Sequence, residues 1–84
     1  MLMGKVIGTI VSTRKNEALV GSKILEARLI EDGKETDKFI VALDSVGAGI
    51  GERVLIATGS SARLAMTNPS APVDAVIVGI VDEK

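Results

Sequence analysis

The chain has 84 residues, 46% of them apolar and nearly all of those aliphatic, which allows a single small domain over residues 1–84. It contains no cysteine and no histidine, which excludes disulfides, thiolate chemistry and the common zinc sites. Ten basic and eleven acidic side chains nearly balance, so the net charge of −1 favours no polyanionic partner.

The first two predicted elements are strands. Residues 5–13 are mostly β-branched, which favours an extended conformation. In residues 23–30, Leu25, Ala27 and Leu29 alternate with charged side chains, which is typical of a half-buried strand. Residues 14–17 between them are expected to form a charged turn, and Arg14, Lys15 and Lys23 a solvated basic face.

A polar connection and two further strands come next. Residues 31–37 are polar and include Asp32-Gly33, a pair typical of tight turns. The apolar runs 39–43 and 53–57 predict a third and a fourth strand.

The C-terminal part is predicted to contain one short helix and one strand. Ser60 or Ser61 starts a helix that runs to about Met66, and the two prolines of residues 68–72 end it. Residues 75–81 are apolar on both faces, which is typical of a strand buried on both sides. These elements predict a mainly β fold, a small five-stranded, OB-like Greek-key barrel with one short helix before the last strand.

Three alternating glycines form the most unusual segment of the chain. Gly47, Gly49 and Gly51 lie between Asp44 and Glu52. Glycine loses much backbone entropy on folding, so such a cluster indicates a turn in which these glycines take positive φ, or a close approach of the backbone to another group. The spacing matches neither a P-loop nor a dinucleotide-binding fingerprint.

Several motifs together are similar to those of the bacterial microcompartment vertex proteins, the EutN/CcmL family. The resemblance covers nearly the whole chain, through residues 3–8, 13–15, 21–25, 42–55, 59–63 and 72–82. It implies a β-barrel subunit that forms a homopentamer and closes the five-fold corners of a polyhedral protein shell. It also implies hexameric shell proteins as partners and a place in the cytoplasm, within that shell.

The same resemblance implies a role in the subunit interface or the five-fold loop for eight residues: Asp44, Gly47, Gly49, Gly51, Glu52, Ser60, Ser61 and Arg63. Two interpretations of Glu52 stay open at this point, a solvated charge at a strand start or an interface partner of Arg63. Ser60 and Ser61 are expected to be helix caps, because a serine nucleophile needs a base and the chain has no histidine.

Two other function classes are disfavoured by composition. An OB-like nucleic-acid-binding module is the alternative function, but Phe39 is the only aromatic residue available to stack on bases. An enzyme is not expected, because the chain offers no recognisable acid–base pair, and no cofactor or metal is implied. No signal-peptide pattern or membrane-spanning run is evident, so we expect a cytosolic protein without a membrane partner. The surplus of aliphatic residues favours self-association.

Overall fold

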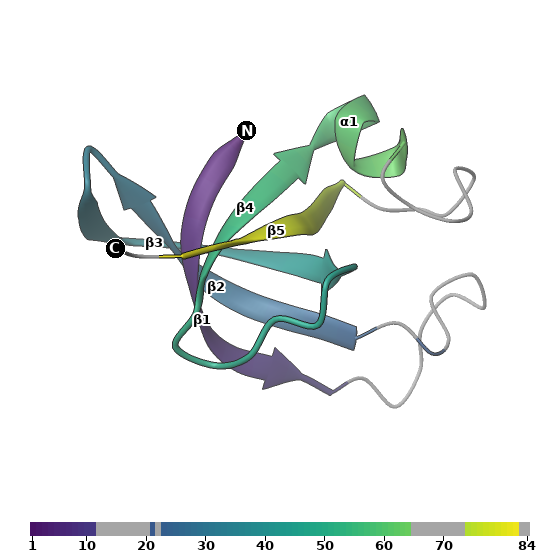
Figure 1. Ribbon diagram of the computed structural model, residues 1–84, viewed down its shortest axis with the longest axis horizontal. Coiled ribbons are helices and arrows are strands. Elements are labelled where there is room, and N and C mark those ends of the chain that lie inside the picture. The colour runs from purple at the N-terminus through teal and green to yellow at the C-terminus, as the bar shows by residue number, and fades with distance from the viewer. Residues whose placement is uncertain (12–20, 22, 65–73, 83–84) are drawn as a thin grey trace.

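The computed structural model describes residues 1–11, 21, 23–64 and 74–82 (Figure 1). Five strands and one short helix are present in these ranges. The helix lies between the fourth and the last strand, as the sequence predicted. The elements in chain order are β1 (Leu2–Ile10), β2 (Lys23–Glu31), β3 (Lys34–Asp44), β4 (Arg53–Thr58), α1 (Gly59–Leu64) and β5 (Ala75–Val81).

The strands close into a barrel in the order β1-β2-β3-β5-β4. All neighbours are antiparallel except β3 and β5, which run parallel and pair at only two positions, Leu43 with Val76 and Asp44 with Ile77. The chain reaches β5 only after passing through β4 and α1, and β4 pairs with β1 to complete the ring. The predicted five-stranded, mainly β barrel is therefore confirmed.

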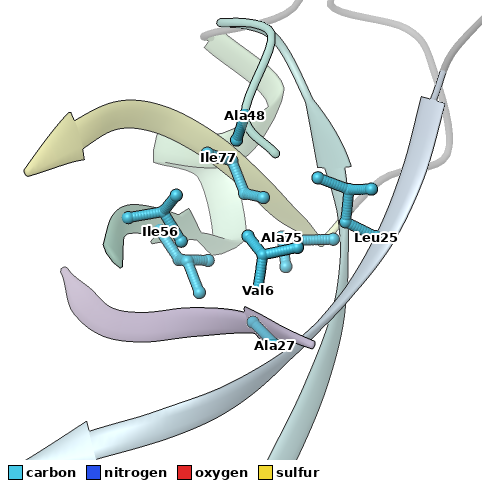
Figure 2. Close-up of a cluster of buried hydrophobic side chains, with 9 residues drawn as sticks. Val6, Leu25, Ala27, Ala48, Ile56, Ala75 and Ile77 are labelled. Atoms are coloured by element: carbon cyan, nitrogen blue, oxygen red, sulfur yellow. The ribbon is translucent and has the colours of Figure 1, made fainter. Parts of the chain in front are cut away.

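The barrel interior is filled by small and branched aliphatic side chains. Leu25, Ile56, Ile77, Val6 and Val54 are each at most 1% exposed. Figure 2 shows Val6, Leu25, Ile56 and Ile77 converging from four strands, together with Ala27, Ala48 and Ala75. This combination of large and small aliphatic residues fills the interior of the five-stranded barrel without an aromatic residue.

A second, smaller apolar cluster lies between the barrel wall and α1. Ala62 of α1 is fully buried against Leu43 of β3 and Val76 of β5. The inward and outward faces of β5 are thus both covered where the helix lies over it, because Ile77 points into the main core and Val76 toward α1.

The connection between β2 and β3 is shorter than predicted. Residues 31–37 were expected to be a polar connection, but β3 begins at Lys34, and only Asp32 and Gly33 form the turn. Their φ values of 53° and 76° are typical of a two-residue hairpin turn. The strands therefore pair directly on either side of the turn, beginning with Glu31 and Lys34. The charged residues of 34–37 are exposed along a projecting hairpin, so polar composition did not prevent strand formation.

The first and last strands also differ from expectation. β1 starts at Leu2 instead of Lys5, because its first four residues pair with β4. The prediction that β5 is buried on both sides is right for Ala75–Ile77 and wrong beyond, since Ile80 is 38% exposed where neither β3 nor α1 covers the strand. The predicted turn 14–17, the ends at Thr13 and Met66 and the prolines of 68–72 lie outside the described residues.

Candidate functional site

The glycine segment forms a loop, residues 45–52, that links β3 to β4 and is organised at its start by Asp44. The Asp44 carboxylate accepts hydrogen bonds from three successive backbone N–H groups, those of Val46 at 3.0 Å, Gly47 at 3.1 Å and Ala48 at 2.9 Å. An aspartate that accepts from the following backbone in this way fixes a turn without any regular secondary structure. Asp44 therefore shapes the loop from within its own chain.

Glu52 organises the other end of the loop in the same manner. Its Oε1 accepts the Gly49 N–H at 2.7 Å, while the Glu52 N–H donates to the Gly49 carbonyl at 3.2 Å. The carboxylate is exposed, yet it is committed to the loop backbone. The two acidic residues that bracket the glycines are thus turn-forming residues, and a Glu52–Arg63 pair stays a prediction.

The loop is also fastened to strands on both of its sides. The Val6 N–H of β1 donates to the Glu52 carbonyl at 3.0 Å, and the Gly51 N–H donates to the Val6 carbonyl at 2.8 Å. At the other end, the Ser45 hydroxyl and N–H both donate to the Ile77 carbonyl of β5, at 2.6 and 3.3 Å. The loop is therefore part of the barrel framework.

Lys23 provides a third attachment, which the sequence did not reveal. Its ammonium donates to the Ala48 carbonyl at 3.0 Å, across 25 positions of the chain. Lys23 was expected to belong to a solvated basic face, because nothing in the sequence brings it close to the glycines. The only signal that could have found it is the strand register, which places Lys23 directly opposite Asp44.

Two of the three glycines have the left-handed conformation, and Gly49 is not one of them. Gly47 has a φ of 78° and Gly51 a φ of 90°, whereas Gly49 is outside the positive-φ region. The expectation of positive φ is therefore confirmed at Gly47 and Gly51 and is wrong at Gly49. At Gly49 the constraint is space, since an added Cβ would lie 3.3 Å from Glu52 Oε1.

A matched pair of substitutions separates these two constraints. We expect Gly51→Ala to lower the free energy of unfolding by about 1–2 kcal/mol, because L-residues are disfavoured in the left-handed region. Gly49→Ala should lower it less, because the Glu52 side chain can move by a few tenths of an ångström. Urea denaturation of both variants measures the difference, and a larger loss for Gly49→Ala would contradict this assignment.

The second part of the motif lies in α1, next to the start of the loop. Gly59 has a φ of 63°, and its N–H donates to the Asp74 carbonyl at 3.0 Å, which ties the helix start to the beginning of β5. Ser60 is exposed, Ser61 and Arg63 follow within α1, and Ala62 between them packs on Leu43. Leu43 immediately precedes Asp44, so the apolar cluster under α1 includes the residue just before the start of the loop segment.

A polar depression of about 340 Å³ borders the other end of the loop. It is lined by residues from β1, the loop, β4 and the end of β5, namely Lys5, Gly51, Glu52, Arg53, Ile80, Val81 and Asp82. Acidic and basic side chains are mixed in it, which gives no preference for one ligand charge. Within the described ranges, no group of acidic residues could hold a metal ion, and no helix is long and apolar enough to cross a membrane.

The chain matches known proteins over almost its full length. Residues 1–82 match the family described as ethanolamine utilisation protein EutN/carboxysome. The bacterial microcompartment shell vertex protein GrpN of Rhodospirillum rubrum is 51% identical over 83 residues, which cover 98% of this chain and 93% of that protein. A solved structure of a GrpN pentameric microcompartment shell protein from the same species aligns with a TM-score of 0.89 at 45% identity, covering 99% of this chain and 95% of that one. The structure of Gloeobacter violaceus CcmL aligns with a TM-score of 0.92 at 44% identity, covering 98% and 86%.

Proposed function

Because this chain belongs to the EutN/CcmL family, we propose that it is a shell vertex protein of a bacterial microcompartment, located in that shell within the cytoplasm. The proposal rests on one combined observation. The sequence matches a named shell vertex protein over nearly its full length, and the fold aligns with that of a pentameric shell protein. Its function is structural, since the family consists of shell proteins and not enzymes. No observation favours the nucleic-acid-binding alternative.

We expect the protein in solution to be a homopentamer of about five times 8.7 kDa. A single subunit leaves large apolar side chains uncovered, such as Ile50 at 69%, Val41 at 51% and Phe39 at 49% exposure. Contiguous exposed apolar surface on a small protein favours association, and five copies close when the contact is heterologous and repeats by rotation. Native mass spectrometry measures the stoichiometry, and a monomer that persists at micromolar and higher concentrations would contradict the proposal.

The loop 45–52 and α1 are the part of the subunit that we propose for contacts within the ring. The loop contains four of the eight motif residues and begins directly after a fifth, Asp44, and hydrogen bonds to the side chains of Asp44 and Glu52 fasten its backbone. A contact surface that is already ordered loses less entropy on association than a flexible one. The other three motif residues, Ser60, Ser61 and Arg63, lie on α1, whose Ala62 shares an apolar cluster with Leu43 at the end of β3.

Other shell proteins are the second class of partner. Shell vertex relatives occupy the corners of microcompartments, so their neighbours in the shell are further shell proteins. We propose that these neighbours are hexamers, because a surface tiled by six-fold units needs five-fold units to close. The exposed side chains of the ring's outer edge would then meet the hexamer edge.

A further inference from the structure

Two residues on neighbouring strands hold the same point of the loop. Lys23 of β2 and Asp44 of β3 face each other in the strand register. Asp44 accepts the N–H of Ala48 at 2.9 Å, and Lys23 donates to the carbonyl of the same residue at 3.0 Å. The methyl group of Ala48 is fully buried in the barrel core. The backbone of Ala48 is therefore held on both sides by charged groups, and its side chain is held by packing.

The loop exposes an apolar side chain two residues after Ala48. Ile50 is 69% exposed and stands between Gly49 and Gly51. Both of these neighbours are fixed, because the Gly49 N–H donates to Glu52 and the Gly51 N–H donates to Val6. Ile50 is thus a large apolar side chain displayed on a backbone that is already in place.

A fixed, exposed isoleucine has the properties of an anchor residue at a protein–protein contact. Burying such a side chain removes apolar surface from water, and little backbone freedom remains to be lost. A few centrally buried residues carry most of the binding energy of many interfaces; these are most often Trp, Tyr and Arg, and an isoleucine contributes through its buried apolar area. Within a ring of identical subunits the natural occupant is the next subunit, whose receiving surface must differ from the loop because the contact is heterologous. The exposed pair Phe39 and Val41 on the outer face of β3 supplies a second apolar surface on another element.

We propose that the loop 45–52 is a preformed docking element that buries Ile50 against a second copy of this chain, and that Lys23 is its positioning residue. The proposal rests on the proposed function, because it assumes that the chain forms a ring. Lys23 acts through Ala48 and need not touch the neighbouring subunit. Its removal would loosen the loop without removing any apolar surface from the contact.

The anchor is tested with Ile50→Ser and its conservative control Ile50→Val, each followed by native mass spectrometry over a dilution series. Ile50→Ser should weaken the association of neighbouring subunits by about tenfold to a hundredfold, the effect of losing one buried aliphatic side chain. Ile50→Val should retain assembly close to the wild type. Circular dichroism checks that both variants keep the barrel. Equal assembly of the serine variant and the wild type would overturn the proposal.

The positioning residue is tested with Lys23→Met, which keeps the side-chain length and removes the donor. Lys23→Met should weaken association by about tenfold, and hydrogen exchange of the Val46, Gly47 and Ala48 amides should become faster. Lys23→Arg should restore both, and Lys38→Met, which removes an exposed lysine paired with Glu31, should change neither. In the Ile50→Ser background, Lys23→Met should cause little further loss, because the contact that it prepares is already gone. Unchanged assembly of Lys23→Met would overturn the positioning role.

The outcomes separate this proposal from the proposed function. A wild-type protein that is monomeric would overturn the proposed function itself. A wild-type pentamer that Ile50→Ser leaves intact would overturn only the docking element. If the Ile50→Ser pentamer is intact but no longer binds hexameric shell protein, the occupant of the loop is that other protein and not a second copy.

Discussion

Shells assembled without this protein should remain open at their corners. A sheet of hexagonal units cannot close into a polyhedron unless five-fold units are present, and we propose that this chain provides them. Co-expression of shell hexamers alone should therefore give sheets, tubes or particles with missing vertices. Addition of the wild-type chain should restore closed polyhedral particles with the protein at the corners, as electron microscopy with a labelled chain would record.

The Ile50→Ser variant is the matched control for this experiment. It differs from the wild type by one exposed side chain, and it should fail to restore closure if ring formation is what closure requires. Closed shells that form equally well without any vertex protein would contradict the function proposed for the chain. Closure by a variant that remains monomeric would contradict the requirement for a preassembled ring.

Asp44→Ala should lower the stability more than any single substitution within the loop 45–52. It removes the acceptor of three backbone hydrogen bonds, at Val46, Gly47 and Ala48. Hydrogen bonds to a charged group contribute more than neutral ones, but water can replace part of them at the exposed positions, so we expect a loss of about 2–4 kcal/mol. Urea denaturation measures this loss, and native mass spectrometry its effect on assembly.

Asp37→Ala provides the comparison for this loss. Asp37 is an exposed aspartate of the β2–β3 hairpin, and it is paired with Arg28 at 3.6 Å. Exposed ion pairs contribute little, so this variant should lose far less stability than Asp44→Ala. Asp44→Asn should fall between the two, because the amide retains one acceptor oxygen. A loss for Asp44→Ala no larger than that for Asp37→Ala would show that the loop does not depend on its first carboxylate.

Most of the barrel could be predicted from local sequence patterns. The alternation of Leu25 and Ala27 with charged residues gave the correct faces of β2, and the apolar run of residues 75–81 gave the bounds of β5. The differences arose where pairing between distant segments decides the outcome. β1 begins at Leu2 because β4 pairs with it, and Lys34–Asp37 are strand because the Asp32-Gly33 turn continues the ladder.

The glycines in the sequence predicted where the loop lies, but its backbone conformation and hydrogen bonds could not be predicted. Glycine content alone could not tell that Gly47 and Gly51, and not Gly49, take positive φ, because this depends on which N–H groups the flanking carboxylates bind. The hydrogen bond from Lys23 to Ala48 could not be predicted either. The two residues are distant along the chain, and the side chain of Ala48 has no polar group that would indicate a partner. When a side chain forms its hydrogen bond with the backbone alone, its role follows from the three-dimensional structure and not from the residue types in the sequence.

The seam between β3 and β5 has the fewest strand pairs of the barrel, so we expect it to be its weakest line under load. Only two residue pairs join these strands, in the parallel arrangement that is slightly weaker per residue, so an applied load should separate them first. Ser45 bridges this line through two hydrogen bonds to Ile77, and it is the first residue of the loop. A pull exerted by a neighbouring subunit on the loop would therefore arrive at the place where the barrel is fastened. In the proposed ring, stress at a corner would therefore act on the closure of each barrel as well as on the contacts between subunits.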